Sequence, residues 1–387
     1  MTEGVILPGA TLGVMGGGQL GRMFAHAAQR MGYFTAVLDP DAASPAGLVS
    51  HHHIHTDYLD NDGLGRLAAI SAAITTEFEN VPAKALATLA MTRPVAPGAQ
   101  AVEIAQDRAR EKAHFVKCGV PCAPYAVLEK PEDFASVTDD LLPGLLKTSR
   151  LGYDGKGQAR VNNRDELARA WAGMNQVPCV LEKLLPLAWE CSVIVARGRN
   201  GDMVNLPPQR NLHREGILAV TEVMEGAIAQ AQAQQVIEAT RKIAQDLDYV
   251  GVLCVEFFAL ADGSLVVNEM APRPHNSGHY SMDACDVSQF ELQVRTMAGL
   301  PLTQPRQHSP AIMLNLLGDL WFMQGDNEVT PPWDAVLALP GTSLHLYGKQ
   351  SARKARKMGH LNITRATPQA VRETALQAAA LLGIAAF

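Results

Sequence analysis

The sequence GVLCVEFFALADGSLVVNEM, residues 251–270, predicts a β-hairpin that carries two glutamates. Asp262-Gly263 is a dipeptide favoured in two-residue type I′ turns, and a turn centred there places Glu256 directly opposite Glu269. Carboxylates on one face of adjacent strands repel each other, so a bound cation is the natural explanation for the pair. Few, hard oxygen ligands suit Mg²⁺ that also contacts nucleotide phosphates. Two unlinked acids on a solvated strand face are the simpler alternative.

The loop directly after the hairpin, APRPHNSGH at residues 271–279, is dense in hydrogen-bonding side chains. Prolines restrict its conformation, and it carries Arg273, His275, Asn276 and Ser277. These features favour a loop that contacts a ligand over a plain linker.

The rest of the chain predicts three domains. Residues 11–100 alternate strand and helix, which is typical of a small parallel α/β unit. A turn at residues 93–98 and a charged helix, QDRAREKAHFVKCG, lead into an α+β segment, and a third segment with three strands and a final helix near 368–382 begins after Leu300. We expect domains at 1–105, 106–300, with a lid lobe at about 122–186, and 301–387.

Two glycine-rich turns have the composition of phosphate-binding loops. Gly16–Gly21, GGGQLG, matches G-x-G-x-x-G between a strand and a helix, and Asp39 ends the next strand, where a ribose-binding acid would lie. Alone, this pattern suggests a nicotinamide-dinucleotide enzyme, although another phosphate could use the same loop. The second turn, RLGYDGKGQ at residues 150–158, is no P-loop, but its glycines permit a closing hairpin and Lys156 carries positive charge. A flexible surface hairpin is the alternative.

Composition narrows the class of protein. The 387-residue chain has a formal net charge of -6, which provides no general attraction to nucleic acid or to an anionic membrane. The six cysteines form no C-x-x-C pair, there is no apolar run of 18 residues, and the N-terminus lacks signal-peptide features, so a reduced cytoplasmic protein is expected. We interpret the histidines of residues 51–55 as an exposed loop, and the basic run KQSARKARK at 349–357 as a phosphate-monoester contact or a solvated face.

Taken together, GGGQLGRM, TTEFENVP, LGYDGKGQ, NLHREGI, VNEMAPRPHNSGH and GKQSARKARKMGHLNIT resemble the N5-carboxyaminoimidazole ribonucleotide synthetases of the ATP-grasp superfamily. The match runs in order from about Leu12 to Thr364. The resemblance implies a mixed α/β and α+β architecture: an ATP-grasp fold with a Rossmann-like preATP-grasp domain and a small C-terminal domain. It also implies ATP- and bicarbonate-dependent carboxylation of aminoimidazole ribonucleotide through carboxyphosphate, with Mg²⁺, in a homodimer.

The resemblance also assigns residues. It implies Glu256 and Glu269 as metal ligands and Tyr153, Asp154, Arg273, His275 and Lys349 as catalytic residues. The implied ATP site comprises Arg108, Lys147, Gly152, Tyr153, Asp154, Gly155, Lys156, Gly157, Gln158, Glu182, Lys183, Leu184, Leu185, Glu190, His213, Asn268 and Glu269. The implied ribonucleotide site comprises Gly18, Gln19, Leu20, Glu77, Asn80, Tyr153, Asp154, Arg273, His275, Asn276, Ser277, Lys349 and Arg356. The proton acceptor stays open between Asp154 and His275.

Three other functions remain in competition. A formate-using ATP-grasp transformylase would share the glutamate pair but not the full set of substrate loops. A dinucleotide-dependent dehydrogenase would bind NAD and not turn over ATP. A nucleotide sensor would bind ATP without releasing ADP.

Overall fold

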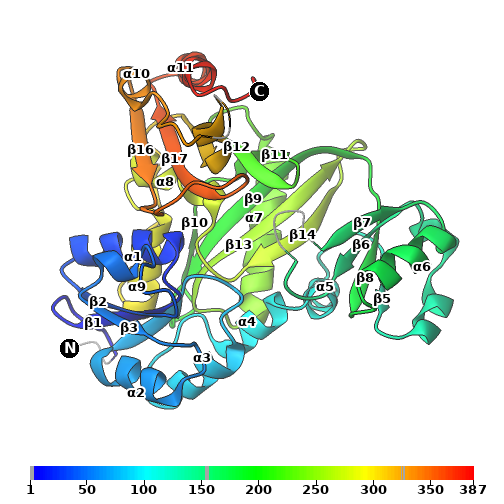
Figure 1. The fold of residues 1–387 in the computed structure, drawn as a ribbon, viewed down its shortest axis with the longest axis horizontal. Coiled ribbons are helices and arrows are strands. Elements are labelled where there is room, and N and C mark those ends of the chain that lie inside the picture. The colour runs from blue at the N-terminus through cyan, green and yellow to red at the C-terminus, as the bar shows by residue number, and fades with distance from the viewer. Residues whose placement is uncertain (1–3, 153–156, 324, 326) are drawn as a thin grey trace.

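The computed structural model describes residues 4–152, 157–323, 325 and 327–387. Its described residues form three sheets, and the large central sheet has a smaller one on either side in Figure 1. The N-terminal sheet is parallel, with strand order β3-β2-β1-β4. Its elements are β1 (Thr11–Met15), α1 (Gln19–Arg30), β2 (Phe34–Asp39), β3 (His52–His55), α2 (Asn61–Ile70), β4 (Ala73–Thr76) and α3 (Ala83–Ala90). The predicted parallel α/β unit is therefore confirmed.

A small antiparallel sheet, ordered β5-β8-β6-β7, forms the lobe that projects to the right in Figure 1. The chain reaches it through α4 (Ala99–Ala105) and α5 (Arg108–Lys117). Asp107 caps α5, because its carboxylate accepts hydrogen bonds from the amides of Ala109 and Arg110. The lobe contains β5 (Tyr125–Leu128), β6 (Gly144–Thr148), β7 (Gln158–Val161), α6 (Arg164–Gly173) and β8 (Cys179–Lys183).

The central sheet has nine strands and continues without a break into the C-terminal segment. Its order is β14-β13-β9-β11-β12-β15-β17-β16, with β10 paired to β9. The first part comprises β9 (Leu187–Arg197), β10 (Met203–Asn205), β11 (Gln209–Arg214), β12 (Ile217–Val223), α7 (Gln230–Asp246), β13 (Gly251–Leu260), β14 (Leu265–Ala271), α8 (Ser281–Ala284) and α9 (Gln289–Ala298). The second part comprises β15 (Ala311–Leu317), α10 (Trp333–Leu337), β16 (Thr342–Leu346), β17 (Lys357–Thr364) and α11 (Pro368–Leu381).

Helix α9 joins the N-terminal unit to the central sheet. Ser288 caps its first turn by accepting the Glu291 amide, and Gly299 ends it in the left-handed region at φ 69°. On one side, Phe290, Val294 and Met297 are buried in the same hydrophobic cluster as residues of β1 and α1. On the other side, Leu292 is buried in one cluster with Val252 and Cys254 of β13, so α9 packs against both the N-terminal unit and the strand of the glutamate hairpin.

The β13–β14 hairpin confirms the predicted pairing but not the predicted turn. Leu260 and Ser264 flank a three-residue loop, in which the amide of Gly263, at φ 84°, donates to the carbonyl of Leu260. That loop alone would place Glu256 opposite Asn268. A β-bulge between the Phe257–Val267 pair and the Glu256–Glu269 pair leaves Asn268 as the extra residue and brings the two glutamates opposite each other.

Two further expectations need correction. Residues 52–55 are not a loop: they form β3, the edge strand paired with β2. Strands β11 and β12 were not predicted at all. They are joined at Glu215 and Gly216, both with positive φ, and glutamate is an unusual residue for such a turn.

Within the described ranges, no helix combines the length and the apolar character needed to cross a membrane.

Candidate active site

Glu256 and Glu269 line one cavity, and each carboxylate has a basic partner. Oε1 of Glu256 lies 2.8 Å from Nε2 of His275, and Oε2 of Glu269 lies 3.2 Å from Nη1 of Arg108. Nε2 of His213 lies 3.9 Å from the other oxygen of Glu256, and its Nδ1 lies 2.6 Å from Glu190. The repulsion expected between the two glutamates is therefore compensated from three sides.

The charge of Glu256 is maintained despite its burial. Burial by itself would raise the pKa of this carboxyl, but the charges and hydrogen bonds of His275, His213 and Lys357 outweigh that effect and hold the pKa well below its usual range. Glu256 is thus an anion at neutral pH. The pKa of Glu111, which lines the same cavity from α5, is instead raised to about 8 by burial and by the nearby charge of Glu269.

A buried polar network holds His275 in place. Its Nδ1 lies 2.9 Å from Oγ of Ser277, whose hydroxyl lies 2.7 Å from that of Ser192. The Asn211 amide donates to Ser192 and accepts from Thr221. Ser277 is fully buried, and it is not one of the described residues that line the two cavities. The contact of Ser277 with the ribonucleotide stays a prediction, and in this structure its hydroxyl contacts His275 and Ser192.

A group of basic side chains lies at the base of the lobe. Nζ of Lys147 and Nζ of Lys112 lie 3.1 Å and 3.3 Å from the same oxygen of Glu182, and all three side chains are buried. Burial lowers the pKa of Lys147, and the neighbouring Arg108 and Lys112 add to that effect. Two lysines sharing one carboxylate leave positive charge for an anionic ligand, as phosphate binding requires.

The second cavity, of about 750 Å³, lies at the N-terminus of α1. It is within the size range of small-molecule sites, about 300–1,000 Å³. The carboxylate of Glu77 accepts hydrogen bonds from the amides of Gly18 and Gly21 at 2.9 and 3.0 Å. Glu77 therefore occupies part of the helix terminus itself.

The hydrogen bonds of Asp39 to the glycine loop argue against a dinucleotide-binding site. Oδ2 of Asp39 accepts from the Gly17 amide at 2.6 Å and from the Tyr58 hydroxyl at 2.7 Å, and Oδ1 accepts from the Asp41 amide at 2.8 Å. Both oxygens of the expected ribose acid are thus used to hold the loop.

The C-terminal segment contributes the basic wall of the second cavity. Nζ of Lys349 donates to Oε1 of Gln19 at 2.7 Å and to the carbonyl of Lys357 at 2.6 Å, so it spans from the C-terminal strands to α1. Arg356 lines the same wall, and Nη1 of this residue donates to the carbonyl of Ser351. The basic run at residues 349–357 therefore faces a cavity.

The two cavities meet at the loop after β14. Both are lined by Glu79, Asn80, Arg273, His275, Asn276 and Lys357. Arg273 is held by Glu79, with Nε 2.5 Å from a carboxylate oxygen. Both polar atoms of the Asn276 side chain are buried with no hydrogen-bond partner in the described part of the chain, which is the expected state of a group that binds a ligand.

The structure places the sequence-predicted residues in three groups. Many of them line the joined cavities: Gly18, Gln19, Leu20, Glu77, Asn80, Arg108, Gly152, His213, Glu256, Glu269, Arg273, His275, Asn276, Lys349 and Arg356. Others lie beside them or in the lobe without being among the described lining residues: Lys147, Gly157, Gln158, Glu182, Lys183, Leu184, Leu185, Glu190, Asn268 and Ser277. Tyr153, Asp154, Gly155 and Lys156 lie outside the described residues.

Sequence reasoning assigned no role to the lining residues Glu79 and Glu111, and it included Lys357 only as the end of the basic run. Glu79 lies in the motif TTEFENVP and Lys357 in the basic run, so the sequence signals for both residues were present. Glu111 follows Arg108 by three residues, the spacing that puts two side chains on one face of a helix. In a helix as charged as α5, that spacing does not distinguish a buried face from a solvated one.

Family models match nearly the whole chain in succession. A ribonucleotide synthetase preATP-grasp domain matches residues 9–106, an ATP-grasp domain residues 113–290, and a phosphoribosylaminoimidazole carboxylase C-terminal domain residues 311–374. The fold and the site therefore define an ATP-grasp ligase with the expected accessory domains.

Relatives narrow this class to one family. The N5-carboxyaminoimidazole ribonucleotide synthase of Brucella melitensis is 44% identical over 374 residues, covering 96% of this chain and all of the relative. A crystal structure of an N5-carboxyaminoimidazole ribonucleotide synthetase in complex with ADP has a TM-score of 0.89 at 39% identity and covers 98% of both chains. An enzyme of Aspergillus clavatus in complex with ADP and aminoimidazole ribonucleotide has a TM-score of 0.87 at 30% identity and covers 97% of this chain and 98% of its own. The chain belongs to the N5-carboxyaminoimidazole ribonucleotide synthase family.

Proposed function

We propose that the chain carboxylates the 5-amino group of aminoimidazole ribonucleotide, using ATP and bicarbonate, in purine biosynthesis. The observation that carries the proposal is the continuity of the two cavities at Arg273, His275 and Asn276. One cavity contains the glutamate pair with Arg108, and the other contains the α1 terminus with Lys349. Such a site holds a nucleoside triphosphate and a phosphate monoester with their reacting ends at one loop.

ATP occupies the cavity beside β13 and β14 in this proposal. Arg108 and Lys147 neutralise charge on the phosphates, the 150–158 turn closes over them, and Lys183–Leu185 with Glu190 bind the adenosine part. Phosphoryl transfer needs positioning and charge neutralisation more than a protein nucleophile. The residue types on this wall fit that requirement.

The donor set fits Mg²⁺. Glu256 and Glu269 supply carboxylates on one face, and Oδ1 of Asn268, the bulged residue, is buried with no hydrogen-bond partner in the described part of the chain. Few oxygen donors that leave positions for phosphate and water are typical of Mg²⁺ sites. When bound, the ion would neutralise charge on the β- and γ-phosphates.

The ribonucleotide binds at the second cavity, with its phosphate near Gln19, Leu20 and the basic wall at Lys349 and Arg356. A helix N-terminus and local cations together favour a phosphate monoester. Because Glu77 already accepts two of the loop amides, the basic wall must provide most of the charge.

The chemical step balances without an additional reagent. A bicarbonate oxygen attacks the γ-phosphorus of ATP and ADP leaves. The substrate amine then attacks the carbon of carboxyphosphate, phosphate leaves, and the amine loses one proton. Carboxyphosphate is unstable in water, so closure of the lobe has a clear purpose.

The contacts of His275 favour a positioning role over that of the proton acceptor. Nε2 faces Glu256 and Nδ1 faces Ser277, so both nitrogens already have hydrogen-bond partners. Asp154 is then the better candidate for the base. We further propose a cytoplasmic homodimer, as the family resemblance implies.

The test is ADP release measured with aminoimidazole ribonucleotide and bicarbonate, and separately with glycinamide ribonucleotide and formate. The proposal predicts release only with the first pair. Release with the second pair would indicate the transformylase reaction, and ATP binding without release would indicate a sensor.

A further inference from the structure

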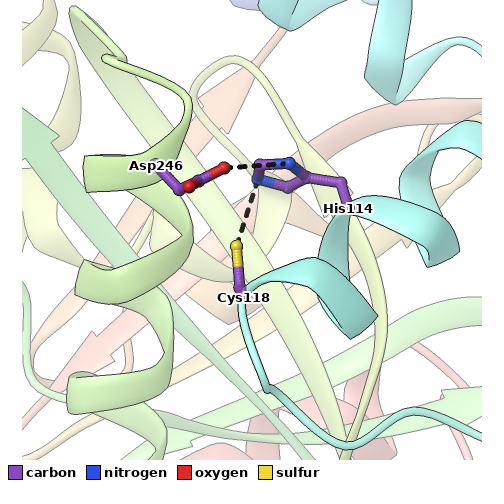
Figure 2. A group of neighbouring side chains, drawn as sticks. All are labelled: His114, Cys118 and Asp246. Atoms are coloured by element: carbon purple, nitrogen blue, oxygen red, sulfur yellow. Dashed lines mark hydrogen bonds and ion pairs between the residues drawn. The ribbon is translucent and has the colours of Figure 1, made fainter.

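A second cluster of metal-ligand side chains lies between α5 and α7, on residues that do not line the cavities described above. His114 and Cys118 are one helical turn apart at the C-terminal end of α5, and Asp246 is the last residue of α7. In Figure 2 the side chains of Asp246 and Cys118 both approach the imidazole of His114. Sγ of Cys118 is 3.5 Å from Nε2, and Oδ2 of Asp246 is 3.5 Å from Nδ1.

The imidazole is fixed and suited to ligation. It is hydrogen-bonded to the backbone of Ile243, one turn before Asp246, and metal-binding histidines commonly use their second nitrogen in this way. Burial lowers the pKa of His114 below its usual value, with Asp246 opposing the shift, so the ring is neutral and has a lone pair at neutral pH.

The distance between the sulfur and the nitrogen suits a shared ion. Zinc lies about 2.0–2.1 Å from a histidine nitrogen and about 2.3 Å from a thiolate, so tetrahedral ligands of these kinds are about 3.5 Å apart. Cys118 and His114 already have that separation. All three ligand atoms lie within 4.8 Å of one another, and the Asp246 side chain is about one-third exposed, so a small rotation brings it to the ion.

We propose that His114, Cys118 and Asp246 bind a thiophilic divalent cation such as Zn²⁺, with water as the fourth ligand. Three protein ligands plus water is an established zinc arrangement. Binding replaces the thiol proton of Cys118, which leaves to solvent, and no oxidation is involved. The ion fastens α5 to α7, and α5 carries Arg108 and Glu111 at the ATP cavity.

Nearby lysines oppose the ion but are readily displaced. Nζ of Lys117 lies 2.8 Å from the same Asp246 oxygen, and Lys242 is also close enough to act on Cys118. Lys117 is 68% exposed, and surface ion pairs of this kind contribute little. The ion enters from this open side.

The test is titration of the reduced, metal-free full-length protein with Co²⁺, followed through the thiolate-to-cobalt charge-transfer absorption. One equivalent is expected to produce this band, Zn²⁺ to abolish it, and Zn²⁺ to raise the melting temperature. Cys118→Ser should eliminate the band, and His114→Ala should weaken Co²⁺ binding at least tenfold. Cys122→Ser, four residues beyond the site, is the matched control and should retain the band.

Binding at the glutamate pair is distinguishable, because the described lining residues of that cavity include no cysteine and give no thiolate band. If the wild-type protein shows no band, or if Cys118→Ser retains it, the assignment is wrong. A melting temperature that Zn²⁺ raises equally in wild type and in Cys118→Ser would also overturn it.

Discussion

His275 and Glu256 form a direct contact, Nε2 to Oε1 at 2.8 Å, that joins the loop after β14 to strand β13. The contact has two consequences. The imidazole stabilises the negative charge of the buried Glu256 carboxylate. His275 also competes for a carboxylate oxygen that a cation would use. His275→Asn should therefore lower kcat about 10- to 100-fold, the loss typical of a residue that supports a metal-ligand side chain, without raising the Mg²⁺ concentration needed for half-maximal activity.

Steady-state kinetics over a Mg²⁺ series checks this prediction, with the exposed loop substitution His308→Asn as the control. An increased Mg²⁺ requirement in His275→Asn would show that the histidine supports the cation site and does not compete with it.

Glu269→Gln should abolish most turnover while leaving folding nearly unchanged. The substitution removes a charge that faces the proposed cation, and loss of one such transition-state interaction costs about 10²–10³ in kcat. In the described structure the substitution breaks only the ion pair of Glu269 with Arg108. The Glu269 side chain is 41% exposed, so the melting temperature should change little. Glu222→Gln, on β12 of the same sheet, breaks an ion pair with Arg372 of α11 and is the control. Parallel losses of activity and melting temperature would instead indicate a structural role.

Ser277→Ala separates a positioning role from a ligand contact. The hydroxyl faces His275 and Ser192, so kcat should fall while KM for aminoimidazole ribonucleotide stays the same. Stability should fall by about 1–3 kcal/mol, because buried partners lose a hydrogen bond. A raised KM with unchanged kcat would instead indicate the direct ribonucleotide contact that the sequence predicts. Ser309→Ala, at the protein surface, is the control.

Acid should destabilise the protein through two buried histidines. His279 and His360 are fully buried with ring centroids 4.5 Å apart. Burial lowers both pKa values well below 6.5, and the nearby charges of His345, His275, Lys357 and Arg273 add to the effect on His279. Since the unfolded chain takes up these protons first, stability is complete above about pH 6.5 and falls as the pH drops below it.

Urea unfolding at about pH 7.5 and about pH 5.5, around the unperturbed histidine pKa, measures this effect. His360→Gln should reduce the difference between the two free energies of unfolding. An unchanged difference would show that other groups account for the acid sensitivity.

Much of the fold was predictable because its signals are local. The parallel N-terminal unit, the strands of the lobe and the closing helix all follow hydrophobic periodicity with clear turn residues. Strands β11 and β12 were not predicted because Glu215 occupies a turn position that usually takes Gly, Asn or Asp. Strand β3 was missed because His52, His53 and His55 are atypical strand residues at a sheet edge.

Many residues that the sequence assigns to the site line the two cavities, but the contacts among them were not predictable. The Glu256–Glu269 pairing was correct, yet it depends on a bulge at Asn268 that no turn rule predicts. Ser277 and Glu77 lie in motifs that suggest ligand contacts, but one is turned beneath His275 and the other already caps the glycine loop. Such details depend on which neighbours surround a side chain, and those neighbours come from distant parts of the chain.

The most direct test of the account uses bicarbonate labelled with ¹⁸O, together with ATP and aminoimidazole ribonucleotide. If carboxyphosphate forms, each turnover should release one ADP and one phosphate that carries a single bicarbonate oxygen. Sustained release of ADP should require aminoimidazole ribonucleotide. Phosphate that contains oxygen from water instead, or ADP release that does not depend on aminoimidazole ribonucleotide, would contradict the account.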